Sequence, residues 1–150
     1  MSPARCPARI VLVEDNPADV FLLELALKET GIAYELTRFV TGEDAVQCLC
    51  DTDSGTTLAP DAILLDLNTP RSDGFQVLVK FKTCPRFANV PIAIITSSRA
   101  SSDKYRSQLH GVRLIEKPSQ LEAFITTVGG AVKEMLSQSR QISISLPHAT

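Results

Sequence analysis

Asp61-Ala-Ile-Leu-Leu-Asp66-Leu-Asn68-Thr-Pro70-Arg-Ser-Asp73-Gly74 is the stretch that decides the fold. Its apolar run, residues 62–65, is bounded by turn formers and predicts a strand buried on both faces, which implies a parallel sheet covered by helices. The run ends in Asp66, and Pro70 and Gly74 then indicate a loop before the next helical pattern. In open α/β sheets, sites form at the carboxyl ends of strands. Taken alone, Asp66 fits a functional acid and a simple loop cap equally well.

Three further predicted strands also end in polar residues. The ends are Glu14-Asp15 after residues 9–13, Thr96-Ser97-Ser98 after residues 91–95, and Glu116-Lys117-Pro118 after residues 112–115. Because the carboxyl ends of parallel strands lie at one edge of a sheet, we expect these groups to gather around Asp66. Core packing needs no carboxylate, hydroxyl or lysine there, so the combination indicates a functional site.

Strand and helix patterns alternate along the chain. A more exposed edge strand is predicted at 34–40, where β-formers alternate with polar residues. Helical patterns cover about 17–29, 41–50, 74–82, 101–109 and a last segment from about Ser119. This order predicts an α/β fold, a doubly wound five-stranded parallel sheet in the order 2-1-3-4-5 with flavodoxin-like topology.

The helical segments differ in their apolar surface. The first favours deep burial over a partner-binding face, because its large apolar residues are Val20, Phe21, Leu22, Leu23, Leu25 and Leu27. In the helical segment at 74–82, we expect Phe75, Leu78 and Val79 to face inward and Phe81 to be partly exposed. The helical segment at 101–109 is rich in serine, which is typical of a short surface helix or of an element that moves.

The last helix and the residues after it carry two further expectations. Gly129-Gly130 interrupts its apolar stripe at a cost of about 1 kcal/mol per glycine, which either the close approach of another surface or plain packing would explain. Residues 137–150 are predicted to form a tail in which Ile142, Ile144 and Leu146 alternate with serine. That period fits a strand added to a sheet edge, but a disordered end is the favoured interpretation.

Composition sets the broad class. The chain has 150 residues and a formal net charge of −2, which fits one soluble domain without an electrostatic preference for nucleic acid. No apolar run approaches the roughly 20 residues that cross a bilayer, and the N-terminal residues lack the apolar segment of a signal peptide. We therefore expect a cytoplasmic protein that binds no membrane. The four cysteines have no CxxC spacing, so structural thiols are expected rather than a metal site.

The residues at the strand ends resemble the pattern of two-component response-regulator receiver domains. That pattern has an acidic pair after the first strand, an aspartate after the third, a threonine or serine after the fourth and Lys-Pro after the fifth. The match includes Asn68, Pro70 and Gly74 in the loop after Asp66. Several separated positions in the right order make this signal far more specific than one short motif.

The resemblance covers nearly the whole chain. It implies a receiver domain at 8–137 and flexible termini at 1–7 and 138–150. Within the family, Thr96-Ser97-Ser98 and the long segment 51–60 are most similar to the stand-alone receivers that serve bacterial and cyanobacterial phytochromes.

The resemblance implies that Asp66 is a phosphoryl acceptor beside a Mg²⁺ site. Glu14, Asp15 and Asp66 would repel one another, and Mg²⁺, which prefers oxygen ligands, would relieve that repulsion. The implied direct ligands are Asp15, Asp66 and the main-chain carbonyl of Asn68, while Glu14 would act through a water.

Other residues of the pattern have implied roles around the phosphoryl group. Lys117 and the Thr96 hydroxyl would stabilise charge on its oxygens. Asn68 and Ser98 would tune how fast water removes it. The bond between Lys117 and Pro118 is implied to be cis.

Phosphorylation adds roughly one to two units of negative charge and would draw Thr96 toward Asp66. The expected result is a change in the surface made by the fourth helix, the fifth strand and the fifth helix. In most of the family an aromatic residue three before the lysine moves with the threonine. Leu114 occupies that position here, which puts the usual rotamer coupling in question but not the phosphorylation.

The function implied is a single-domain response regulator phosphorylated by a sensor histidine kinase. A phytochrome-type kinase is one candidate, and the sequence names neither the kinase nor its stimulus. It would catalyse only its own phosphorylation and dephosphorylation. Output would pass by protein contact to a target that the sequence does not name, and a homodimer through the face around Leu114 is a further hypothesis. No DNA-binding module is expected, so no nucleic-acid partner is either.

Rival interpretations fit less well. An aspartate-nucleophile phosphatase would need a second Asp two residues after the first, but Pro17 follows Asp15 and Asn68 follows Asp66 at that spacing. A metal-dependent nuclease fails at Asn68 for the same reason. The remaining alternative is a receiver-like protein-interaction module without phosphate cycling.

Overall fold

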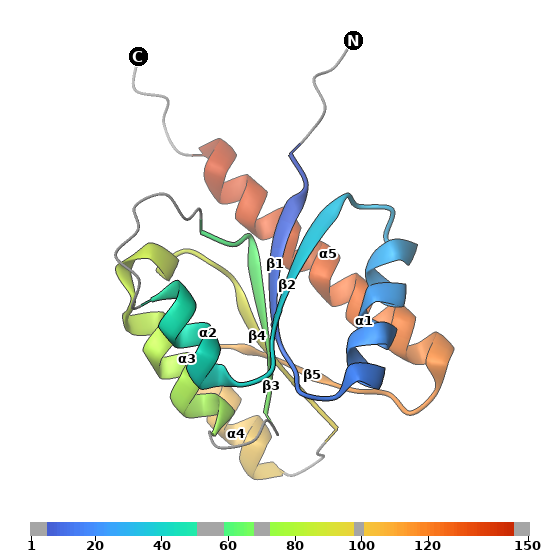
Figure 1. The fold of residues 1–150 in the computed structure, drawn as a ribbon, viewed down its shortest axis with the longest axis horizontal. Coiled ribbons are helices and arrows are strands. Elements are labelled where there is room, and N and C mark those ends of the chain that lie inside the picture. The colour runs from blue at the N-terminus through green and yellow to red at the C-terminus, as the bar shows by residue number, and fades with distance from the viewer. Residues whose placement is uncertain (1–5, 51–58, 68–72, 98–100, 146–150) are drawn as a thin grey trace.

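The computed structural model describes residues 6–50, 59–67, 73–97 and 101–145 as alternating strands and helices (Figure 1). The elements are β1 (Ala8–Val13), α1 (Pro17–Glu29), β2 (Tyr34–Phe39), α2 (Gly42–Leu49), β3 (Ala62–Asp66), α3 (Gly74–Thr83), the 3-10 turn η1 (Pro85–Phe87), β4 (Ile92–Thr96), α4 (Ser101–His110), β5 (Arg113–Glu116) and α5 (Leu121–Ser145). The strands form one five-stranded parallel sheet in the order β2-β1-β3-β4-β5. The predicted fold class and strand order are confirmed. Within these ranges no helix has the length and hydropathy of a membrane span.

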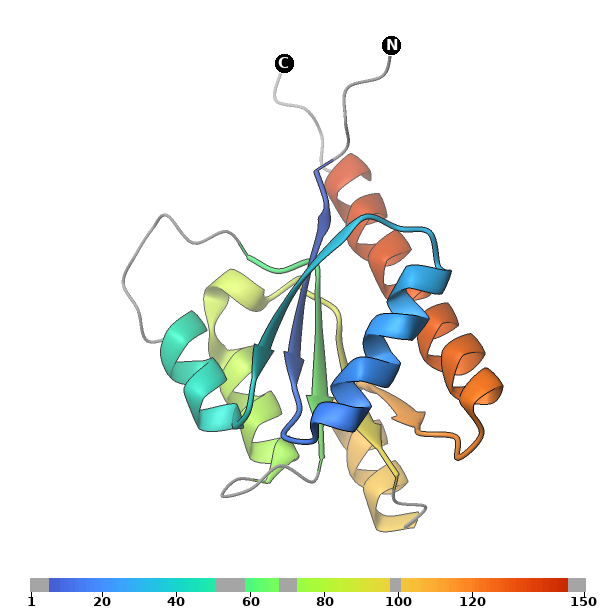
Figure 2. The ribbon, with the colours of Figure 1, turned by 45° about the vertical axis from the view of Figure 1, so that its right-hand side comes forward.

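Helices cover both faces of the sheet (Figures 1 and 2). The core on one face is shared with α1 and α5, and the core on the other with α2 and α3. Successive strand residues point to opposite faces, so Ile10 and Leu12 join the first core while Val11 and Val13 join the second. Residues 62–65 alternate in the same way. Burial on both faces explains the continuous apolar runs at 10–13 in β1 and 62–65 in β3.

Short polar side chains set the starts of helices next to the strand ends. Asn16 caps α1 by accepting the N–H of Ala18 at 2.9 Å, and Pro17 occupies the first helical position. Thr41 caps α2 by accepting the N–H of Asp44 at 3.1 Å. The Asn16 cap lies three residues after the last residue of β1, and the Thr41 cap lies two residues after the last residue of β2.

Two predictions of which helix side chains are buried are wrong. In α3, Val79 is 44% exposed and Phe81 is 0% exposed, the reverse of the expectation. Phe81 packs against Phe87 of η1, with ring centroids 5.6 Å apart, and burying the larger side chain removes more apolar surface from water. α1 is also less buried than expected, because it packs along one stripe and leaves Phe21 63% exposed.

α5 is longer than expected. It continues through Ser145, so the tail predicted from residue 137 is wrong for residues 137–145. A formed helix extends at little cost per residue, and no glycine or proline occurs between Gly130 and Pro147. Residues 146–150 lie outside the described residues, and the domain limits of 8–137 stay a prediction.

The two adjacent glycines of α5 have different surroundings. A Cβ atom on Gly129 would lie 3.2 Å from the carbonyl oxygen of Ala26 and 3.4 Å from Cγ2 of Thr30, both of which lie across the α1–α5 contact. A Cβ atom on Gly130 would have nothing within 4 Å. Gly129 therefore allows the close approach of another surface, the first of the two explanations that the sequence left open.

This difference predicts opposite effects of alanine at neighbouring positions. We expect Gly130→Ala to stabilise the protein by up to about 1 kcal/mol, because alanine has the higher helix propensity. Gly129→Ala has the same propensity gain but presses on the α1 backbone, so it should be less stable than Gly130→Ala by roughly 1–2 kcal/mol. Urea unfolding followed by circular dichroism measures both values. Equal stabilisation by the two substitutions would contradict the tight α1–α5 contact.

Candidate phosphoryl-acceptor and cation site

The carboxyl ends of four strands meet at one edge of the sheet and bring the expected residues together. Glu14 follows β1, Asp66 ends β3, Thr96 ends β4 and Lys117 follows β5. Thr96 lies opposite Glu116 in the parallel register, and the N–H of Lys117 donates to the carbonyl oxygen of Thr96 at 2.8 Å. The strand register therefore places all four residues around one point.

Three carboxylates, those of Glu14, Asp15 and Asp66, form an acidic cluster. One oxygen from each residue lies within 4.8 Å of the others. Glu14 is 3% exposed and Asp66 is 5% exposed. Carboxylates withdrawn from water at this spacing disfavour one another's charged forms. Their oxygens and excess negative charge suit a hard divalent cation such as Mg²⁺.

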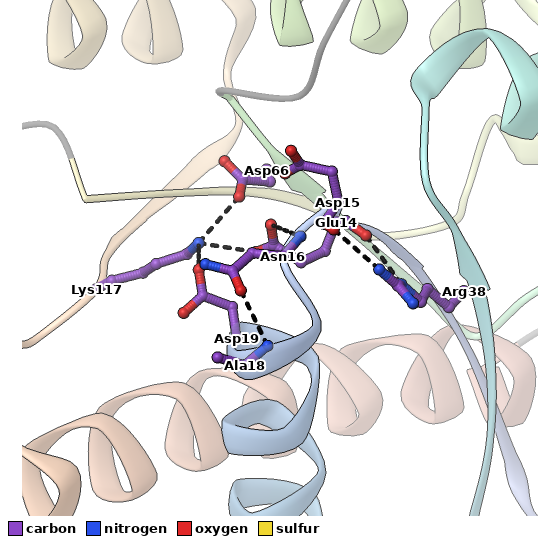
Figure 3. A network of polar contacts seen from close by, with 8 residues as sticks. All are labelled: Glu14, Asp15, Asn16, Ala18, Asp19, Arg38, Asp66 and Lys117. Carbon is purple, nitrogen blue, oxygen red and sulfur yellow. Dashed lines mark hydrogen bonds and ion pairs between the residues drawn. The ribbon is translucent and has the colours of Figure 1, made fainter.

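Lys117 lies at the centre of the site (Figure 3). Its ammonium donates to Glu14 Oε1 at 2.8 Å, to Asp19 Oδ2 at 2.8 Å and to Asp66 Oδ2 at 2.9 Å. The Lys117 side chain is only 10% exposed, and an ammonium has three donors, so each donor can meet one carboxylate. One lysine thus ties the ends of β1 and β3 to the start of α1.

Two residues of the site were not predicted from the sequence. Asp19 is the third residue of α1, where an acid is common because it complements the helix dipole, so it had no separate signal. Arg38 of β2 donates from Nε to the carbonyl oxygen of Glu14 at 3.0 Å and from Nη2 to that of Asp15 at 3.1 Å (Figure 3). Arg38 could have been predicted from the strand order, because β2 lies beside β1. These bonds hold the backbone of the acidic pair.

The other predicted site residues have different outcomes. Thr96 is buried, and Leu114 is half-buried against the core that β5 shares with α3. Asn68 and Ser98 lie outside the described residues. The described residues contain no cis peptide bond, so the predicted cis bond before Pro118 is wrong. The trans form is favoured by about 0.5–1 kcal/mol before most prolines.

A second polar cluster connects α4 to the start of α3. Nη2 of Arg106 lies 2.6 Å from Oδ2 of Asp73, the residue that caps α3 by accepting the N–H of Phe75. The Arg106 guanidinium also lies over the Phe75 ring, 4.1 Å from its centroid. The His110 ring stacks on the same phenyl ring, with centroids 5.5 Å apart. These contacts attach α4 to the N-terminal end of α3.

Burial and neighbouring charges change the ionisation of the two most enclosed groups. Burial, and after it the hydrogen bond with Asp66, raises the pKa of Glu14 from its ordinary 4.5 to about 8. Burial opposes the charged form of Lys117, but its hydrogen bonds outweigh burial, the one to Asp19 most strongly, and raise the pKa of Lys117. Without a cation, Glu14 therefore holds a proton at neutral pH while Lys117 stays charged.

The raised pKa of Glu14 predicts a pH-dependent stability. Native Glu14 binds a proton up to about pH 8, whereas in the unfolded chain its pKa returns to 4.5. Because the native state binds more protons in this window, the melting temperature of the cation-free protein should fall as the pH rises through it. Mg²⁺ binds the deprotonated cluster, so millimolar Mg²⁺ should raise the melting temperature most at the upper end of the window.

Differential scanning fluorimetry in EDTA and in Mg²⁺ across this pH window tests the prediction. Glu14→Gln should flatten the pH dependence. Glu43→Gln, which changes an exposed acid of α2, should leave it as in the wild type. A melting temperature unaffected by Mg²⁺ at every pH would contradict a cation site at the cluster.

Sequence and structure comparisons agree on one family. The sequence matches the response regulator receiver domain over residues 10–129. Response regulator Rcp1 of Synechocystis sp. is 33% identical over 126 residues, which cover 83% of this chain and 86% of that protein. The solved structure of the phosphorylated cyanobacterial phytochrome response regulator RcpA has a TM-score of 0.79 at 31% identity, covering 88% of this chain and 96% of that one. The Mn²⁺-bound form of Rcp1 has a TM-score of 0.77 at 30% identity, covering 95% and 100%. The chain therefore belongs to the response regulator receiver domain family and is similar to cyanobacterial phytochrome response regulators.

Proposed function

We propose that this protein is a response regulator that accepts a phosphoryl group from a sensor histidine kinase on Asp66, in a reaction that requires a divalent cation. The observation that carries the proposal is the position of Asp66 at the end of β3, inside the acidic cluster and 2.9 Å from the Lys117 ammonium. A carboxylate held beside a cation site and a lysine is arranged for attack on phosphorus rather than for packing. The similarity to RcpA, whose solved form is phosphorylated, supports the same role.

In the proposed transfer, a carboxylate oxygen of Asp66 attacks the phosphorus atom of a phosphohistidine. An oxygen–phosphorus bond forms, giving an acyl phosphate, and the nitrogen–phosphorus bond breaks. The imidazole leaves with the electron pair of that bond and takes a proton from solvent. Lys117 and the Thr96 hydroxyl stabilise the charge that spreads over the equatorial oxygens. Hydrolysis then releases inorganic phosphate and returns the free Asp66 carboxylate, so the proposed catalysis is limited to the protein's own phosphorylation and dephosphorylation.

Glu14, Asp15 and Asp66 are the residues proposed to hold the cation. The fit rests on their three oxygens within 4.8 Å and on the reluctance of buried Glu14 to ionise without a positive partner. When bound, Mg²⁺ would neutralise charge on the phosphoryl oxygens. The main-chain carbonyl of Asn68 is a further proposed ligand. The similarity to Rcp1, which has been solved in a Mn²⁺-bound form, supports the binding of a divalent cation.

The proposed switch begins at Thr96, whose hydroxyl is attracted to the new phosphoryl group and displaces the chain between β4 and α4. α4 is attached to α3 by the ion pair of Arg106 with Asp73, so its displacement requires this contact to loosen. Leu114 is half-buried on β5, and as an aliphatic residue it makes no aromatic rotamer change. The face formed by α4, β5 and α5 is the proposed output surface.

The proposed upstream partner is a histidine kinase, and similarity to Rcp1 and RcpA favours a phytochrome-type kinase. The downstream partner is a protein, and a second copy of this chain is one candidate for the output surface. Asn68 and Ser98 are proposed to tune the hydrolysis of the acyl phosphate. Both are small and polar, so neither would block a water.

Intact-mass measurement after incubation with Mg²⁺ and acetyl phosphate tests the proposal. We expect the mass of one phosphoryl group to be added per chain, to be absent in EDTA and to be removed by hydroxylamine, which cleaves acyl phosphates. A folded protein that gains no phosphoryl group would overturn the proposal. The function would then be that of a receiver-like protein-interaction module without phosphate cycling.

A further inference from the structure

The three carboxylates that bond to Lys117 do not have equal roles. Glu14 and Asp66 belong to the acidic cluster proposed to hold the cation, and Asp66 is also the proposed phosphoryl acceptor. Asp19 lies outside that cluster, although its Oδ2 is 2.8 Å from the Lys117 ammonium. Of the three partners of Lys117, Asp19 is therefore the one that neither the proposed cation nor the proposed phosphoryl group would engage.

Asp19 is also a well-fixed negative charge. It lies in the first turn of α1, which is capped by Asn16 and packs against the sheet and α5 (Figure 3). The positive end of the helix dipole stabilises a carboxylate at this position. Its side chain is 26% exposed, so the pair with the enclosed Lys117 is only partly screened by water. α1 thus offers an anchor that does not depend on the occupancy of the site.

We infer that Asp19 is a positioning residue, which holds the Lys117 ammonium so that its two other donors turn from Glu14 and Asp66 to the phosphoryl oxygens. The inference rests on the proposed function, because it needs Asp66 to be phosphorylated. An ammonium has three donors, so one bond to Asp19 leaves two for the phosphoryl group. Without that bond, the flexible four-carbon side chain of Lys117 would let its ammonium move away from the phosphoryl oxygens.

The expected effect is on the rate of phosphoryl transfer. We expect Asp19→Ala to slow phosphorylation by acetyl phosphate and Mg²⁺ about tenfold, because a misplaced charge-stabilising group costs catalysis of this order or more. Asp19→Asn keeps an acceptor oxygen without the charge and should fall between this variant and the wild type. Asp44→Ala is the matched control, since Asp44 is exposed and is also the third residue of its helix, α2. Its rate should equal that of the wild type.

A double-mutant cycle separates positioning from a general structural effect. In a Lys117→Met background no ammonium remains to be positioned, so adding Asp19→Ala should change the rate less than about twofold. Rates that fall by independent factors in the double variant would overturn the inference.

A second readout does not depend on turnover. We expect the coupling between Asp19 and Lys117, measured from the melting temperatures of single and double variants, to be the same in EDTA and in Mg²⁺. The coupling between Glu14 and Lys117, measured with Glu14→Gln, should become smaller in Mg²⁺, because Glu14 then faces the cation. Equal losses of both couplings in Mg²⁺ would overturn the inference.

The outcomes distinguish the inference from the proposed function. A wild type that gains no phosphoryl group would overturn the proposed function and the role of Asp19 with it. A labelled wild type whose Asp19→Ala variant reacts as fast as Asp44→Ala would overturn the role of Asp19 alone.

Discussion

Asp66→Asn is expected to gain no phosphoryl group under conditions that label the wild type completely. An amide oxygen is a far weaker nucleophile than a carboxylate, while the side chain keeps its shape and an acceptor for the Lys117 bond of 2.9 Å. The substitution also removes the negative charge of one of the three acidic residues of the cluster. We therefore expect the melting temperature in EDTA to be unchanged or higher by roughly 2–4 °C, the shift that about 1 kcal/mol gives at this chain length.

Asp61→Asn is the matched control for this variant. Asp61 directly precedes β3, at the opposite end of the strand from Asp66, and accepts the N–H of Arg9 at 2.8 Å. It should be labelled as fully as the wild type, because it is remote from the acidic edge. If Asp66→Asn were still phosphorylated, the phosphoryl acceptor would be another residue. A fall in its melting temperature of about 10 °C or more would show that Asp66 supports the fold instead of straining it.

The sheet and the acidic edge were predictable because their signals are local. The apolar run at 62–65 is buried on both faces whatever its neighbours are, and this requires a parallel sheet with two helical layers. In such a sheet the carboxyl ends of the strands lie together. Contiguous sequence thus sufficed to predict that Glu14, Asp66, Thr96 and Lys117 would share one edge.

Side-chain partners and helix rotation were not predictable, because they depend on contacts between distant parts of the chain. An acid at Asp19 is common at any helix start, and only the three-dimensional structure shows that it meets Lys117. In α3, the apolar residues allow more than one rotation, and Phe87 of η1 selects the one that buries Phe81. The C-terminal end of α5 was likewise missed, because a helix that has formed can extend into residues whose own sequence alternates like a strand.

Lys117→Met is expected to cause the largest loss of stability among single changes at the site. Methionine keeps most of the aliphatic stem but removes the ammonium that bonds to Glu14, Asp19 and Asp66. Removing one partner of a buried ion pair costs about 3–5 kcal/mol, and partial exposure of Asp19 reduces this to roughly 2–4 kcal/mol in EDTA. The loss should be larger near pH 8 than near pH 5, because Glu14 carries its proton up to about pH 8.

Mg²⁺ should separate the two roles of Lys117. A bound cation can replace the missing positive charge, so millimolar Mg²⁺ should restore much of the lost melting temperature. It should not restore phosphorylation, which we expect to be at least about 100-fold slower than in the wild type, because the Thr96 hydroxyl is then left without the ammonium to stabilise charge on the phosphoryl oxygens. Lys133→Met, an exposed change on α5, should match the wild type in both measurements. If Mg²⁺ restored the rate together with the stability, Lys117 would be only a counter-ion to the acidic cluster, and its part in phosphoryl transfer would be wrong.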